Sequence, residues 1–113
     1  MNVQIYALKR NFDVQKAERY FKERKLPFQF VDLTRHKLGI REIETFKSQV
    51  GLKALIDETT NAWKESTARF LSPDGDALIE ALAQNPKYLK LPIVRNGKQI
   101  TVGYQPDIWA KWE

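Results

Sequence analysis

The stretch NVQIYALKRNFDVQKAERYFKERKLPFQFVDL, residues 2–33, contains two short apolar segments separated by an amphipathic one. Residues 2–8 and 28–33 are rich in β-branched and aromatic side chains, which predicts two strands. The apolar positions between them recur at steps of three and four, at Val14, Ala17, Tyr20 and Phe21. This spacing predicts a helix of about three turns that ends at Leu26-Pro27. A strand, a helix and a strand within about 30 residues form a βαβ unit, so the chain is predicted to be an α/β protein.

The end of the chain predicts a second pair of strands. In LPIVRNGKQITVGY, residues 91–104, two apolar runs flank Asn96-Gly97, a pair that favours the tight turn of a β-hairpin. The final QPDIWAKWE predicts a short amphipathic helix. We expect Trp109 to anchor this helix in the core and Trp112, next to the chain end, to be exposed.

The middle of the chain is predicted to be helical. Apolar side chains of residues 40–50 share one helical stripe, and Gly51 follows where a helix C-cap is expected. The stripe consists of Ile40, Ile43, Phe46 and Val50. Residues 52–70 predict one helical turn and then a second helical piece around Trp63, a core residue. Ser72-Pro73-Asp74 predicts the start of a further helix, with Pro73 at its first position and an end near Asn85-Pro86.

This order of elements is that of a thioredoxin-like α/β fold, with helices on a four-stranded mixed sheet. At 113 residues the chain fits one domain, residues 1–113, with a helical insertion over about residues 38–85. No segment approaches the ~20 apolar residues of a membrane span, and the first apolar run is too short for a signal peptide. We therefore expect a cytoplasmic protein that does not bind membranes.

The composition excludes several kinds of chemistry. The chain has no cysteine, so disulfides, thiolate nucleophiles and cysteine-based metal sites are ruled out. His36 is the only histidine and lies among polar residues, which predicts a surface position; neither a metal nor a cofactor is expected. Residues 1–53 carry 12 of the 19 Lys and Arg but 6 of the 14 Asp and Glu. This basic half either steers an acidic partner or simply solvates its helices, and no motif predicts nucleic-acid recognition.

Four segments, in this order, resemble the ArsC, Spx and YffB family of the thioredoxin superfamily. They are IYALKRNFDVQKAERYF at 5–21, LPFQFVDL at 26–33, VGLKALIDETTNAWKE at 50–65 and NPKYLKLPIVRNGKQITVGY at 85–104. The resemblance covers essentially the whole chain. It implies a thioredoxin fold with an ArsC-type helical insertion, in a protein related to arsenate reductases and glutaredoxin-like oxidoreductases.

The resemblance also implies that the family's active site is degenerate in this chain. The nucleophilic cysteine of the family lies where this sequence has Asn11, and the second cysteine of Spx-like members falls at Val14. Two arginines that hold the oxyanion in arsenate reductases fall at Thr59, or a close neighbour, and at Leu91. Pro92 matches the family proline, which implies a cis bond before it. Because an amide and an isopropyl group offer no nucleophile, no arsenate reductase activity is expected.

Two functions stay open. The first is a non-catalytic protein-interaction or regulatory module that binds a protein partner. The Spx resemblance implies RNA polymerase as that partner, which is a weaker expectation than a protein partner in general. The alternative is a glutathione- or oxyanion-binding protein that acts without its own cysteine, through Lys9, Arg10 and Asn11, although Asn11 as a plain helix cap is the simpler interpretation. The backbone beside Pro92 is either a peptide-binding edge or only the start of the third strand. Joint loss of the cysteines and arginines argues against a recent substitution in a cysteine-bearing parent.

Overall fold

The computed structural model describes residues 1–112. The chain folds as two compact units, one formed by residues 1–35 together with the chain from Leu91 onward, and the other by residues 36–90. The helical segment expected at about 38–85 lies in the second unit. None of the helices within residues 1–112 has the length and apolar character needed to cross a membrane.

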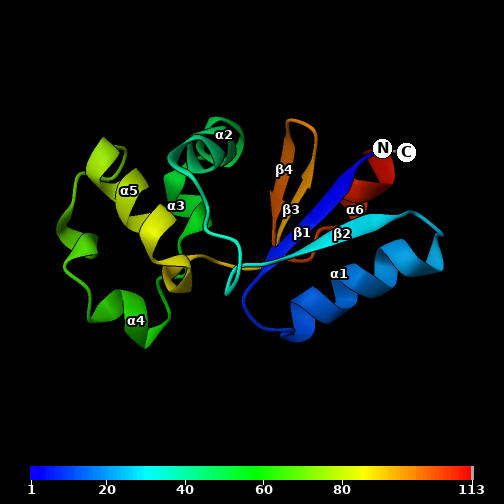
Figure 1. The fold of residues 1–113 in the computed structure, drawn as a ribbon, viewed down its shortest axis with the longest axis horizontal. Coiled ribbons are helices and arrows are strands. Elements are labelled where there is room, and N and C mark those ends of the chain that lie inside the picture. Colours follow the sequence, from blue (N-terminus) through cyan, green and yellow to red (C-terminus); the bar gives the residue numbers. More distant parts are fainter. Residues whose placement is uncertain (113) are drawn as a thin grey trace. The chain divides into compact units, whose positions relative to one another are not determined.

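The first unit is built on a four-stranded mixed sheet (Figure 1). Its strands are β1 (Val3–Ala7), β2 (Phe28–Asp32), β3 (Ile93–Asn96) and β4 (Gln99–Val102). They lie in the order β2-β1-β3-β4, with β1 parallel to β2 and antiparallel to β3, and β3 antiparallel to β4. A parallel first pair requires a crossover connection, which helix α1 (Phe12–Glu23) supplies. The predicted βαβ unit and fold class are confirmed.

One core holds α1 and the short helix α6 (Pro106–Trp109) against the sheet. Its fully or nearly fully buried members come from β1, α1, β3 and α6: Val3, Ile5, Ala17, Tyr20, Phe21, Val94 and Trp109. Trp109 is fully buried, as expected, and its indole Nε1 donates to Thr101 Oγ1 at 2.8 Å. The expectation for Trp112 is wrong: the 3₁₀ turn η3 (Ala110–Trp112) continues α6 and packs this indole, half-buried, against the same core.

Helix α1 ends earlier than the Leu26-Pro27 signal predicts, because the chain leaves the helix at Glu23 in a Schellman motif. Lys25 adopts a left-handed φ of 56°. The Leu26 N–H then donates to the Phe21 carbonyl at 2.9 Å, and the Lys25 N–H to the Lys22 carbonyl at 3.1 Å. Glycine is the usual residue at this position. The lysine gives no such signal, which is why the sequence places the end too late.

The predicted hairpin is present, but its turn is shifted by one residue. Asn96 pairs with Gln99 as the last residue of β3, so the turn consists of Gly97 and Lys98. Gly97 has a φ of 62°, the left-handed conformation that the first turn residue of a type II′ hairpin needs. The Asn96 side chain donates to Gln99 Oε1 at 3.2 Å across the ladder instead of occupying the turn.

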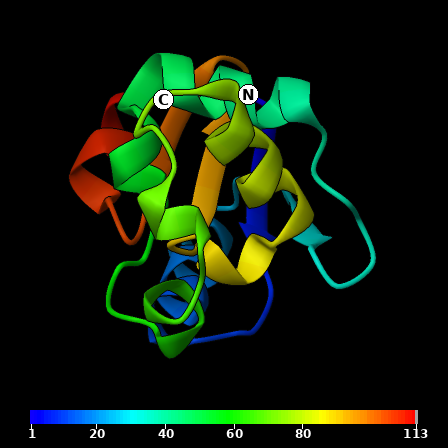
Figure 2. The ribbon, with the colours of Figure 1, turned by 90° about the vertical axis from the view of Figure 1, so that its left-hand side faces the viewer.

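The second unit is helical, shown from green to yellow in Figure 2. Its elements are α2 (Ile40–Val50), α3 (Leu52–Leu55), α4 (Asn61–Lys64), η1 (Ala68–Phe70), α5 (Asp76–Gln84) and η2 (Pro86–Tyr88). Helix α2 packs against α3 and α5. Within residues 36–90, all of which the structure describes, the strand-like pairing is the bridge between Ile56 and Leu89.

Helix α2 confirms the expectation for residues 40–50, although its buried stripe is narrower. Ile43 and Phe46 are fully buried, whereas Val50 is half-buried and Ile40 is 50% exposed. Ile40 is the first residue of the helix, so its side chain lies beyond the turn that faces the core. Trp63 is buried, as expected.

The predicted helix start at Pro73 is wrong. Ser72 to Gly75 form a turn in which the Gly75 N–H donates to the Ser72 carbonyl at 3.2 Å, with Pro73 as its second residue. Proline at the second position and glycine at the fourth are typical of β-turns. Gly75 then serves as the N-cap of α5, which begins at Asp76. The Ser-Pro-Asp sequence that predicted a helix start therefore forms a β-turn before the helix.

Candidate functional site

The candidate site begins at the loop between β1 and α1, where Asn11 is the N-cap of the helix. Asn11 has extended backbone angles, φ −68° and ψ 177°, and its Oδ1 accepts a hydrogen bond from the Val14 N–H at 2.8 Å. Free N–H groups of the first helical turn need such acceptors. The expected role of Asn11 as a helix cap is confirmed.

The other end of the same amide faces the proline turn that opens β3. Asn11 Nδ2 donates to the Leu91 carbonyl oxygen across a long contact of 3.4 Å. The Leu91–Pro92 peptide bond is cis, as the resemblance implied. The Pro92 carbonyl in turn accepts the Gly103 N–H at 2.8 Å. The Asn11 side chain therefore contributes both of its polar atoms to contacts within the first unit.

Val14, where the resemblance implies the second cysteine of Spx-like members, points into the core. Its side chain is fully buried in the first turn and a half of α1. Val14 thus fills volume under the loop and is shielded from any reactant. The structure brings the exposed Asn11 to the partly exposed Leu91, while Pro92 and Val14 are buried.

The basic residues beside the cap are only partly free. Arg10 Nε lies 3.0 Å from Glu18 Oε1 on α1, and its guanidinium carbon lies 4.0 Å above the ring of Phe30. Lys9 is exposed and forms no hydrogen bond or ion pair with the residues that the structure describes. Of the three predicted anion-binding side chains, Arg10 and Asn11 therefore have partners within the fold. Sequence inspection missed Glu18, which is eight residues from Arg10 and follows no helical spacing to it.

Asp32, at the end of β2, is the titratable group of this unit that its surroundings perturb. Hydrogen bonds from the Thr34 hydroxyl, at 2.7 Å, and from the Thr34 backbone N–H, at 2.9 Å, hold the pKa of Asp32 below its ordinary value of 3.8. The positive charges of Arg35 and Arg10 lower it further. Asp32 is therefore ionised at neutral pH and serves to order its turn.

Thr59 lies in the second unit, in the turn between α3 and α4. Its backbone N–H donates to Asp57 Oδ1 at 3.1 Å, and its hydroxyl donates to the same oxygen. The next residue, Thr60, caps α4 by accepting the Trp63 N–H at 3.3 Å. Thr59 is thus part of a capped turn, and no cation stands at this position.

His36 is exposed, as expected, with Nε2 3.2 Å from Glu42 Oε1. Among residues 1–112, no three His, Cys, Asp or Glu side chains lie together in a way that would hold a metal ion.

The sheet order, the βαβ unit, and a helix-capping loop joined to a cis-proline turn define a thioredoxin-like protein. The ArsC family model matches residues 6–112, so the chain belongs to the ArsC family.

Individual relatives are distant in sequence but similar over nearly their whole length. The global transcriptional regulator Spx 2 of Oceanobacillus iheyensis is 23% identical, with 100% of this chain and 94% of that protein covered. An arsenate reductase from Vibrio cholerae superposes with a TM-score of 0.82 at 23% identity, covering 98% of this chain and 97% of that one. A putative ArsC family related protein from Bacteroides fragilis gives a TM-score of 0.82 at 20% identity, with 100% of both chains covered. At such identities the structural matches establish the fold.

Proposed function

We propose that this chain is a non-catalytic member of the ArsC family that works as a protein-interaction or regulatory module. The observation that carries the proposal is the state of Asn11. The residue at the position of the family nucleophile caps α1 and reaches across to the Leu91 carbonyl, so the reactive centre is occupied by contacts of the fold itself.

The other positions that the resemblance assigns to the family's site support the same conclusion. Reduction of arsenate needs a nucleophile and cations that stabilise the oxyanion. Leu91 and Thr59 carry no positive charge, and the guanidinium of Arg10 is paired with Glu18. Substitution of one residue would therefore not restore the reaction.

The loop end of the first unit offers a surface for a partner. Phe12, the first residue of α1, is 83% exposed, and Lys9, which has no ion pair among residues 1–112, lies in the loop that precedes the helix. An exposed aromatic ring and a cation three residues apart in sequence suit an acidic protein surface, since aromatic residues are enriched at interfaces. RNA polymerase is the first partner to test, because a relative of this chain is a transcriptional regulator.

Absence of catalysis is tested by measuring arsenite formation from arsenate with reduced glutathione and glutaredoxin. We expect no rate above the protein-free control for the wild-type chain or for Asn11→Cys, with the Vibrio cholerae arsenate reductase as the positive control. A clear rate for either form would overturn the proposal.

The interaction role is tested by quantitative co-purification of the tagged full chain from its source cells, and by direct binding to purified RNA polymerase. A partner should be retained in stoichiometric amounts by the wild type and by the matched variant Phe70→Ser, which removes an aromatic ring that is 75% exposed in the second unit. Phe12→Ser should reduce its recovery at least about tenfold, the loss of a hot-spot side chain. Recovery of no stoichiometric partner would count against an interaction module.

The alternative, binding of glutathione or a small oxyanion, has one supporting observation, the free ammonium of Lys9 near the start of α1. Titration with glutathione, phosphate and arsenate, followed by amide NMR shifts, distinguishes it. Saturable shifts at residues 9–14 and 91–93 would favour the alternative, and flat signals at millimolar ligand would reject it.

A further inference from the structure

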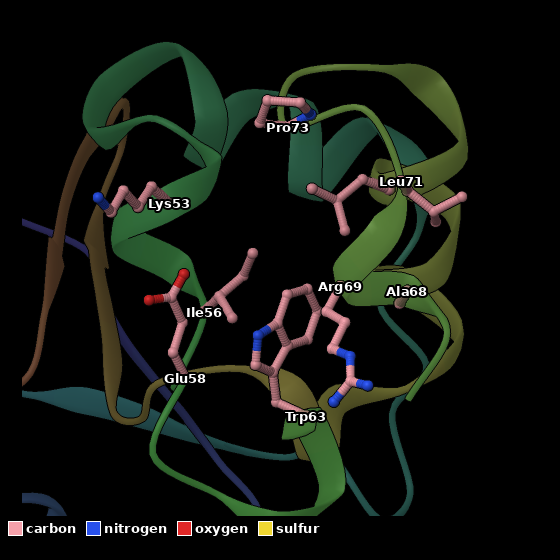
Figure 3. A pocket seen from close by; sticks show the side chains of 9 residues that line it. Lys53, Ile56, Glu58, Trp63, Ala68, Arg69, Leu71 and Pro73 are labelled. Carbon is pink, nitrogen blue, oxygen red and sulfur yellow. The ribbon is translucent and has the colours of Figure 1, made fainter. Parts of the chain in front are cut away.

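The second unit contains a pocket that lies outside the degenerate site. It has a volume of about 270 Å³ and is formed entirely by residues 53–78 (Figure 3). The apolar wall consists of Ile56, Trp63 and Leu78, three side chains that are at most 8% exposed. Figure 3 shows the indole of Trp63 rising into the open space between the chain segments that carry Glu58 and Arg69.

The wall is held in place by contacts on its far side. The ring of Trp63 packs edge-on against Tyr88, with ring centroids 5.7 Å apart and an interplanar angle of 75°. Its backbone is fixed by the Thr60 cap of α4. Ile56 is held by its bridge to Leu89. A pocket wall that is ordered before a ligand arrives avoids the entropy cost of ordering it on binding.

The polar side chains at this pocket lack hydrogen-bond and ion-pair partners in the described part of the chain. Trp63 Nε1 donates no hydrogen bond to any residue from 1 to 112, and the indole nitrogen faces the side on which Glu58 lies (Figure 3). The cations Lys53 and Arg69 and the carboxylate of Glu58 form no ion pair in the described part of the chain. The guanidinium of Arg69 stacks on the ring of Phe70 at 4.5 Å, which leaves its N–H groups available.

We propose that this pocket binds a small aromatic or branched aliphatic carboxylate. The apolar part of the ligand lies against Trp63, Ile56 and Leu78, and its carboxylate accepts hydrogen bonds from Arg69. The ammonium of Lys53 extends away from the open space, and Arg69 and Glu58 lie on opposite sides of the Trp63 indole (Figure 3). A ligand carboxylate can therefore meet the guanidinium of Arg69 on the side away from Glu58, which selects an anion over a neutral molecule. The free indole N–H provides a further donor for a ligand oxygen.

The size of the pocket favours a small molecule over a peptide. A cavity of about 150 Å³ accommodates one benzene molecule. At about 270 Å³, this pocket takes a ring with a short acidic chain and leaves no groove for a second side chain. A ligand of roughly ten heavy atoms is then expected to bind with a dissociation constant near ~1 mM.

The test is a ¹⁵N NMR titration of the full chain at pH 7 with sodium phenylacetate, and in parallel with phenylacetamide, which has the same shape without the charge. The three tryptophans give three indole signals, and the spectrum of Trp63→Phe assigns the signal of Trp63. Phenylacetate should shift the Trp63 indole signal saturably and leave that of Trp109 unchanged. The amide should bind at least about threefold more weakly, the loss expected for a partly exposed charge pair.

Three variants at exposed positions separate this proposal from nonspecific binding. Arg69→Gln should weaken phenylacetate binding about threefold, and Glu58→Gln should strengthen it about twofold because a like charge is removed. Arg41→Gln, which removes an exposed arginine of α2 outside the pocket, should leave the affinity unchanged.

Equal binding of acid and amide would overturn the proposed ligand class, as would an unchanged affinity in both Arg69→Gln and Glu58→Gln. Shifts spread over both units would indicate nonspecific binding and reject the site. Saturable shifts with an acidic, phenylalanine-containing peptide but none with phenylacetate would replace the small-molecule ligand by a peptide. None of these outcomes depends on Asn11, so failure here is distinguishable from failure of the proposed function.

Discussion

The loop that ends at Asn11 and the pocket beside Trp63 differ in how their polar groups are satisfied. Both Asn11 side-chain atoms and the Arg10 guanidinium have partners inside the first unit. At the pocket, the indole N–H of Trp63 and the charges of Arg69 and Glu58 lack partners among residues 1–112. A group that already has a partner in the protein must give it up to bind a ligand, whereas an exposed group without one only exchanges water for the ligand. For ligand binding, the side chains that lack partners in the fold are therefore a better guide than the position that the family resemblance implies.

The largest expected effects compare the two tryptophans. Trp109→Ala should lower the free energy of unfolding by about 5 kcal/mol, and Trp63→Ala by about 3 kcal/mol, within the range for aromatic truncations. Trp109 is enclosed on all sides and loses its bond to Thr101, whereas one face of Trp63 borders the pocket. Urea denaturation of both variants measures the difference. Equal losses would mean that the pocket is filled in solution.

Asn11→Ala tests the cap that closes the first site. We expect a loss of about 1 kcal/mol of unfolding free energy, because the Val14 N–H loses its acceptor. Asn11→Asp is the matched control, since a carboxylate keeps the acceptor and suits the positive end of the helix. A loss of equal size in both variants would show that the contact to the Leu91 carbonyl, and not the cap, supplies the stability.

Tyr20→Phe is expected to raise the free energy of unfolding by about 1 kcal/mol. The Tyr20 hydroxyl is buried and has no hydrogen-bond partner among residues 1–112, so its removal relieves a desolvation penalty. Thermal denaturation with the wild type as reference measures the change. A decrease in stability would reveal a bonded water at this hydroxyl.

Glu18→Gln should make the loop at Asn11 able to bind an anion, as proposed for the pocket beside Trp63. In the pair with Arg10, the arginine side chain is 57% exposed and that of Glu18 13% exposed. Such a partly exposed pair contributes about 0.5 kcal/mol, so stability should change little. The substitution removes the negative charge next to the Arg10 guanidinium, which should then bind phosphate, seen as NMR shifts at residues 9–11 that are absent in the wild type. Phosphate shifts of the same size in the wild type would show that the ion pair does not block the site.

The smallest expected effect concerns Asp32. Its lowered pKa means that the stability it contributes is fully present above the unfolded-state value, near ~3.9, and is lost as the pH falls through the folded-state value. The carboxyl carbon should therefore titrate below 3.8 in an NMR pH series. Thr34→Val, which removes the hydroxyl donor but keeps the backbone N–H, should move this midpoint upward.

Local patterns predicted those parts of the molecule that local chemistry determines. The periodicity of residues 14–21 and 40–50 placed α1 and α2, and Asn11 was identified as a cap because its side chain bonds within its own turn. The end of α1 was missed because Lys25 adopts a conformation that glycine normally signals. The start of α5 was misplaced because proline followed by aspartate suits both a helix start and a β-turn.

The contacts that define both sites lie beyond such patterns. Arg10 meets Glu18 and Phe30 only because α1 packs on the sheet, and no spacing announces this arrangement. The pocket arises where α3, α4, η1 and α5 leave space between them. Trp63 was predicted as a core residue, correctly, but its free N–H depends on packing that the sequence does not encode locally.

The first unit is discontinuous in the chain, and this has a consequence for folding. Strand β1 pairs with β3 only after residues 36–90 have been brought back, so Val3 meets Asn96 across most of the chain. Closing so long a loop costs entropy before any contact compensates for it, and such pairing slows folding. The helical unit has its contacts within one continuous segment. We expect the amides of this unit to gain protection from hydrogen exchange first. The pairing of the central strand β1 with β3 should form last.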